Sequence, residues 1–199
     1  MGEKQVFQPL TREDKITVVL YRIGIVSSTI IMSALAYMLA GRHSATSSIG
    51  PSMEILAYGL YVSVGMSVFC IHLYVGKFKT YLKSMYFIGV GCLVALLFFG
   101  KGSLSGGLAR EPYNALLLLP LSGCLGFVTA KEAFCFKLIE GYLLAMMMPV
   151  YLLLISIGQL YGRGATYGLV LIAVMLVIFT LRKVFMPIAY DVGDKSAYQ

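Results

Sequence analysis

Residues 16–40 read ITVVLYRIGIVSSTIIMSALAYMLA, and this run decides the fold class. It is long enough to cross the hydrocarbon core of a membrane as a helix, and Arg22 is its only charged residue. Of the 199 residues, 59% are hydrophobic and 13% are charged, whereas a soluble domain carries about 25% charged residues. One soluble core of this size could not bury so much apolar surface. We therefore expect an all-α membrane protein.

Five further apolar runs follow the first, which predicts a bundle of about six transmembrane helices. For the fourth run, which contains Pro120, a re-entrant or interfacial segment is the alternative. The chain then divides into a polar N-terminal segment (1–15), the six-helix bundle (16–186) and a short polar tail (187–199) that we expect to be mostly disordered. The six runs span residues 16–40, 55–76, 84–100, 113–130, 138–160 and 166–181.

The basic residues predict the orientation of the bundle. Twelve Lys and Arg residues fall at one end of the expected helices and four at the other. Because cytoplasmic connections carry the excess of Lys and Arg, both termini should lie in the cytoplasm, or in the stroma if the membrane is a thylakoid. The net charge of +7 thus reflects topology, and the sequence has no basic stripe that would favour nucleic acid as a partner.

The sequence holds little that could carry catalysis or bind a metal. Its four cysteines form no CxxC pair, and His43 and His72 are expected at opposite ends of the bundle, so they cannot ligate one haem together. His72 is a candidate axial ligand to a chlorin, and a helix-packing histidine with a hydrogen-bonded partner is the simpler interpretation. We predict no enzyme activity, no metal site and no cofactor, with chlorophyll or a bound lipid as the alternatives.

Two ionisable residues inside the apolar runs predict a buried polar pair. Arg22 lies about two turns into the first run, and Glu140 lies at the start of the fifth. A charge inside the membrane is costly unless it is paired or reaches the interface. We therefore expect an Arg22–Glu140 ion pair between the first and fifth helices. Pairing of Arg22 with Glu132, or with lipid phosphate, is the alternative.

Two other features predict contacts between helices. Small residues at a spacing of four in the second run form a helix-packing face, because such side chains let backbones approach closely. A short segment between the fourth and fifth runs combines charges, phenylalanines and a cysteine, which suits an interfacial docking segment for another membrane protein. The packing face consists of Gly59, Ser63 and Ser67, and the docking segment contains Lys131, Glu132, Phe134, Cys135 and Phe136.

Several short motifs carry a family resemblance over nearly the whole chain. Residues 12–14 (RED), 21–22 (YR), 131–136 (KEAFCF) and 148–149 (MP) resemble an uncharacterised family of integral membrane proteins from cyanobacteria and plastids. The resemblance implies a thylakoid or cyanobacterial plasma membrane and a multi-helix bundle. It supplies no catalytic residues.

These features favour a non-enzymatic accessory subunit or assembly factor that packs against other membrane proteins and lipids. In a photosynthetic membrane, its partner would be a photosynthetic complex. The alternative is a transporter of a small solute or ion with its polar site near Arg22 and Glu140. A transporter should have a cavity that reaches these two residues, whereas an accessory protein should have a closed interior.

Overall fold

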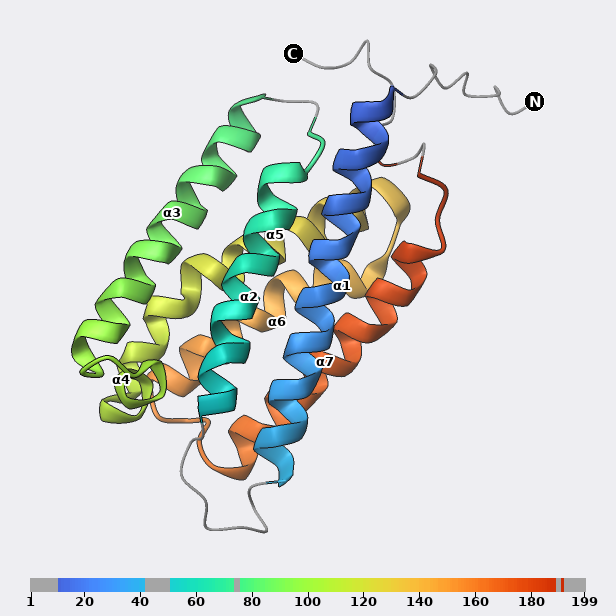
Figure 1. Ribbon diagram of the computed structural model, residues 1–199. Coiled ribbons are helices and arrows are strands. Elements are labelled where there is room, and N and C mark those ends of the chain that lie inside the picture. The colour runs from blue at the N-terminus through green and yellow to red at the C-terminus, as the bar shows by residue number, and fades with distance from the viewer. Residues whose placement is uncertain (1–10, 42–50, 74–75, 189–190, 192–199) are drawn as a thin grey trace.

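The computed structural model describes residues 11–41, 51–73, 76–188 and 191. Within these ranges the chain is helical and has no strand, and six helical segments are long and apolar enough to cross a membrane. Figure 1 shows them as a bundle of long, roughly aligned helices. The elements are α1 (Arg12–Gly41), α2 (Pro51–Cys70), α3 (Gly76–Phe99), α4 (Leu104–Arg110), the 3-10 helix η2 (Pro112–Leu118), α5 (Leu119–Phe136), α6 (Ile139–Ser156) and α7 (Arg163–Val184).

The predicted all-α membrane bundle is confirmed, and two of its helical spans extend beyond the apolar runs that predict them. α1 begins at Arg12, because Thr11 and Asp14 cap its first turn: the Asp14 backbone N–H donates to the Thr11 hydroxyl, and Asp14 accepts from the Thr11 backbone N–H at 2.8 Å. The fourth span starts as η2 and continues as α5, which together cover 25 residues, Pro112–Phe136. Pro120 lies in the first turn of α5, where its missing N–H costs no helical hydrogen bond.

The helices alternate in direction, so the connections gather at two ends of the bundle (Figure 1). We call the end where α1 begins and α7 ends the Lys183 end, and the opposite end the Glu54 end. The connection between α2 and α3 and the one between α5 and α6 lie at the Lys183 end. With six crossings, both termini lie at the same end of the bundle. The described basic residues that we assign to the cytoplasmic side therefore lie together at the Lys183 end.

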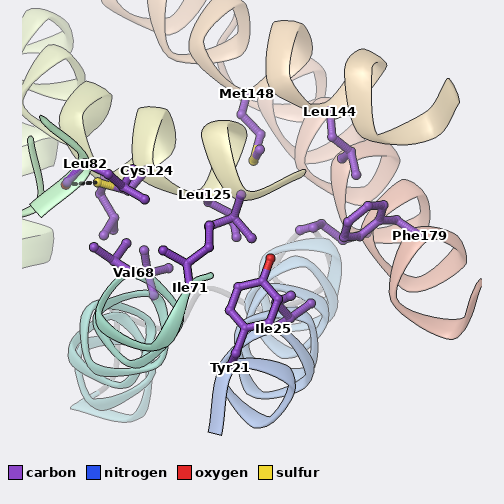
Figure 2. Packing of buried hydrophobic residues seen from close by; sticks show 14 of the residues in the cluster. Tyr21, Ile25, Val68, Ile71, Leu82, Cys124, Leu125, Leu144, Met148 and Phe179 are labelled. Carbon is purple, nitrogen blue, oxygen red and sulfur yellow. Dashed lines mark hydrogen bonds between the residues drawn. The ribbon is translucent and has the colours of Figure 1, made fainter. Parts of the chain in front are cut away.

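The core draws side chains from all six spans. Tyr21 of α1, Val68 of α2 and Leu82 of α3 are buried in one hydrophobic cluster with residues of α5, α6 and α7. Figure 2 shows Leu125, Met148 and Phe179 from these last three helices converging on the same space, with the Cys124 thiol directed at the Leu82 carbonyl oxygen. The cluster extends to the Lys183 end, where charged side chains replace apolar ones.

Candidate functional site

A buried ion cluster closes the Lys183 end of the bundle. Lys183 on α7 is fully buried, and its ammonium group forms ion pairs with Glu132 of α5 and with Asp191, which follows the end of α7. The ammonium group also lies 3.9 Å from the centre of the Phe136 ring, a cation–π contact. Because a buried charge is stable only when it is paired, this lysine fixes three segments relative to one another.

Glu132 is the most heavily contacted carboxylate of the ion cluster. The Tyr21 hydroxyl donates to its Oε1 atom at 2.7 Å, and the Lys131 ammonium group donates to the same atom at 2.8 Å. Its Oε2 atom lies against Lys183. Glu132 therefore joins α1, α5 and α7 from a position with no solvent exposure.

Arg22 extends the ion cluster to the last turn of α7 and the residues beyond. Its guanidinium group pairs with the Asp191 carboxylate at 2.6 Å. Its remaining N–H groups donate to the carbonyl oxygens of Val184, Met186 and Pro187 at 3.1, 2.7 and 3.2 Å. The five donors of arginine suit such a site, since the carbonyls after a helix end have no helical partner.

The expected ion pair between Arg22 and Glu140 is wrong. Glu140 pairs instead with Arg182 of α7 at 2.6 Å, and Arg22 pairs with Asp191. The physical reason is that Asp191 places a carboxylate at Arg22, while Arg182 of α7 places a cation at Glu140. Arg22 does not pair with Glu132 either, because the Tyr21 hydroxyl and two lysine ammonium groups already bind the Glu132 carboxylate.

The buried position of Asp191 also corrects the expectation of a mostly disordered tail at this residue. Asp191 is 4% exposed, and its backbone N–H donates to the Ile188 carbonyl oxygen at 3.1 Å. Two cations hold its carboxylate, so this part of the tail belongs to the bundle.

The small-residue face of α2 lies against α1. The hydroxyls of Ser63 and Ser28 are 2.8 Å apart, and the Ser67 hydroxyl donates to the Tyr21 carbonyl oxygen at 3.3 Å. A Cβ atom on Gly24 would lie 2.8 Å from the Ser63 carbonyl oxygen, so the backbones approach as closely as glycine allows. Gly59 continues this face toward Ile31 of α1.

His72 lies beyond the end of α2 and packs against α1. Its Nε2 atom is 3.3 Å from the Thr17 hydroxyl, and the ring is half-buried. Burial and the nearby ammonium groups of Lys131 and Lys79 lower the pKa of His72 below its usual value. This geometry matches the helix-packing interpretation of this histidine, and among the described residues no three His, Cys, Asp or Glu side chains gather as a metal site would require.

The expected docking segment is divided between the interior and the surface. Lys131 and Glu132 face the ion cluster, whereas Phe134 is 80% exposed and Cys135 is also exposed. Phe136 is partly buried under Lys183. Only the outward side of this helix end could contact a partner.

A large apolar cavity occupies the Glu54 half of the bundle. Its volume is about 610 Å³, within the usual range of ligand sites of about 300–1,000 Å³. Glu54 and Val64 both line it, so it extends roughly 15 Å along α2 at the helical rise per residue. Other lining residues come from α4 and from each remaining span except α3, and they include Met32, Leu104, Leu125, Met148 and Ile172.

Polar groups of this cavity gather near one end. The Glu54 carboxylate accepts hydrogen bonds from the hydroxyls of Ser103 and Ser105, the latter at 2.9 Å, through its Oε1 atom. Deeper in the cavity, Tyr61 is 4% exposed, and its hydroxyl has no hydrogen-bond partner in the part of the chain that the structure describes. Neither Arg22 nor Glu140 is among the lining residues.

A family model described as "Uncharacterized integral membrane protein (DUF2301)" matches residues 66–199. The chain belongs to this family. The DUF2301 segment contains Glu132, Lys183 and Asp191 of the ion cluster, while Tyr21, Arg22 and Glu54 precede it. The expected membership in a family of uncharacterised integral membrane proteins is thus confirmed.

A relative of similar length occurs in Haemophilus influenzae. It is described as "Uncharacterized protein" and is 23% identical over 201 residues, which cover 100% of this chain and 99% of the relative. No solved structure matches the chain.

The sequence did not lead us to the central residues of the ion cluster or to Glu54 of the apolar cavity. In the sequence, Lys183 was only one of the basic residues that predict the orientation. Asp191 lay in the tail that we expected to be mostly disordered. Glu54 stands four residues after Gly50 at the start of an apolar run, a position that resembles an ordinary helix start. Two carboxylates close to a span end, Glu132 and Glu140, were the available signal that more than one cation should be buried there.

Proposed function

We propose that this DUF2301 member is a non-enzymatic membrane protein that binds a lipophilic molecule in the apolar cavity. The observation that carries the proposal is the cavity itself, about 610 Å³ in volume and lined almost wholly by apolar side chains. A bundle without such a role would fill this space, since protein interiors pack to the density of organic crystals.

The position of the cavity favours a lipid or another membrane-soluble compound as the occupant. A second hollow of about 390 Å³, lined partly by Tyr161 of the turn between α6 and α7, shares Leu108, Ile155 and Ala165 with the cavity. The two hollows therefore adjoin near the Glu54 end. His72 lies at the opposite end, which favours a lipid over a chlorin with a histidine ligand.

The transporter with a polar site near Arg22 and Glu140 has less support. Both residues are held in ion pairs at the Lys183 end, away from the cavity. The contacts of the ion cluster favour a structural role, since they fasten α1, α5 and α7 together.

An accessory or assembly role beside another membrane protein is the second candidate function. The exposed Phe134 and Cys135 at the end of α5 favour it, because they offer an aromatic ring and a thiol on the outside of the bundle. In a thylakoid or cyanobacterial membrane the partner would be a photosynthetic complex. Purification of the tagged chain in mild detergent tests this role: a stoichiometric partner lost in Phe134→Ala supports it, and its retention contradicts it.

Ligand binding can be tested with a tryptophan reporter, because the chain has no tryptophan of its own. Leu169 lines the cavity, whereas Val174 on the same helix is 50% exposed and lies outside the lining. In phosphatidylcholine nanodiscs, a brominated alkanol should quench the tryptophan of Leu169→Trp with saturation. The tryptophan of Val174→Trp should be quenched in proportion to the alkanol in the membrane.

A cavity-filling variant supplies the decisive comparison. Ala57 lines the cavity, so Ala57→Phe should abolish the saturable quenching. Gly91→Phe is the matched control, because a side chain there meets open space on exposed α3. Linear quenching at both reporters, or saturation that survives Ala57→Phe, would refute the proposed function.

A further inference from the structure

Hydrogen bonds from the start of α4 fix the polar end of the apolar cavity. Ser103 caps α4 by accepting the Gly106 backbone N–H at 3.0 Å, and its hydroxyl donates to Glu54. The Ser105 hydroxyl donates to the same carboxylate oxygen. The start of α4 thus holds the Glu54 side chain of α2 in a fixed position at the cavity wall.

No cation of the described chain balances this carboxylate. The described basic residues of the Glu54 end are Lys101, Arg110 and Arg163, and none forms an ion pair with Glu54. Arg110 donates to the Phe99 carbonyl oxygen instead. The Glu54 carboxylate is partly buried and lines the polar end of an apolar cavity, where its negative charge favours a positively charged occupant.

The other polar groups of the lining do not compete for such an occupant. The Ser122 hydroxyl donates to the Leu119 carbonyl oxygen, and the Tyr151 hydroxyl donates to the Ala165 carbonyl oxygen. Tyr61 keeps a buried hydroxyl without a partner among the described residues, which leaves one free polar group deeper in the wall. The lining therefore combines one carboxylate at an end with a long apolar body.

We infer that the cavity is selective for an amphiphilic amine: a single alkyl chain with an ammonium head group. The ammonium group lies against the Glu54 carboxylate, and the alkyl chain extends along α2 toward Met148 and Leu125. An alcohol of the same chain length gains the apolar contacts without the ion pair, and a fatty acid is repelled by Glu54. This inference rests on the proposed function and adds the class of ligand.

Three brominated probes of equal chain length test the selectivity: an alkylamine, an alkanol and an alkanoic acid. With the Leu169→Trp reporter in phosphatidylcholine nanodiscs at pH 7, half-maximal quenching should need about tenfold less amine than alkanol, as one charge-assisted hydrogen bond would give. The acid should bind more weakly than the alkanol. Glu54→Gln should abolish the preference for the amine, and quenching by the alkanol that still saturates shows that the variant is folded.

The outcomes separate this inference from the proposed function. Saturable binding of the alkanol with no preference for the amine, or a preference that survives Glu54→Gln, overturns the amine assignment and leaves the binding cavity in place. Absence of saturable quenching by all three probes overturns both. Arg42 lies outside the described residues. A preference for the amine that appears only in Arg42→Gln would show that this residue supplies the counter-charge, and would also overturn the assignment.

Discussion

The ammonium group of Lys183 on α7 is paired with the carboxylate of Glu132 on α5, and neither residue is exposed to solvent. The pair belongs to a cluster in which three cations share two carboxylates: Lys131, Lys183 and Arg22 surround Glu132 and Asp191. This unequal number makes the cluster asymmetric. Loss of either acid leaves one cation without a carboxylate, whereas loss of one cation leaves both acids paired.

We therefore expect Glu132→Gln to destabilise the bundle more than Lys183→Met. Removing one partner of a buried pair costs about 3–5 kcal/mol, and in Glu132→Gln the Lys131 ammonium group loses its carboxylate. After Lys183→Met, Glu132 keeps Lys131 and Asp191 keeps Arg22. The free energy of unfolding in mixed detergent micelles measures the difference.

Two further variants sharpen this test: a double variant that restores the net charge of the ion cluster, and a control at an exposed residue. Adding Lys131→Met to Glu132→Gln should recover part of the lost stability, because the cation that lost its carboxylate is removed. Lys77→Met should change the stability by at most about 0.5 kcal/mol, since Lys77 is exposed. Equal costs for Glu132→Gln and Lys183→Met would contradict the asymmetry.

Arg22 should couple energetically to Asp191 and not to Glu140. In a double-mutant cycle, Arg22→Met and Asp191→Asn should deviate from additivity by about 0.5–3 kcal/mol, as expected for residues in direct contact. Arg22→Met and Glu140→Gln should add within about 0.3–0.5 kcal/mol. Unfolding of the purified variants measures both cycles, and coupling in the second cycle alone would restore the pairing that the sequence predicts.

Apolar run length and the distribution of charge were enough to predict six spans, since the bilayer fixes the length of a helix that crosses it. Spacing also predicted that Ser63 and Ser67 form a packing face, because helical periodicity determines which residues share a side. Ion pairing could not be predicted in the same way. It depends on how helices distant in sequence lie next to each other, and on the return of Asp191 after α7, which follows no periodic pattern.

The contact between α1 and α2 should not tolerate a larger residue at Ser63. Its hydroxyl is 2.8 Å from that of Ser28, so Ser63→Leu forces the helices apart at a cost of about 1–3 kcal/mol. The neighbouring Val62 is 70% exposed, and Val62→Leu serves as the control with little effect. Equal melting temperatures for Ser63→Leu and the parent would show that this contact does not constrain the helices.

The Lys183 end should face the cytoplasm. In cytoplasm-out vesicles of a variant without native cysteines, a membrane-impermeant maleimide should label Lys79→Cys and spare Arg163→Cys, because basic residues concentrate at the end that holds Lys79. Detergent should make Arg163→Cys reactive, which controls for burial. The opposite pattern in intact vesicles would reverse the orientation of the bundle.

Acidification should weaken the junction between His72 and Thr17. Burial and the neighbouring ammonium groups lower the pKa of His72 in the folded protein, whereas in the unfolded chain its pKa is near 6.5. Below that value the unfolded state binds a proton that the folded state does not, so stability falls as the pH drops from 6.5 toward the folded pKa and then levels off. His72→Gln keeps a polar side chain without this titration, and its melting temperature should depend less on pH between 7.5 and 5, a range set by the ordinary histidine pKa of about 6.5. If the parent and His72→Gln lose the same stability over that range, the acid sensitivity belongs to other groups and the histidine serves only to pack the helices.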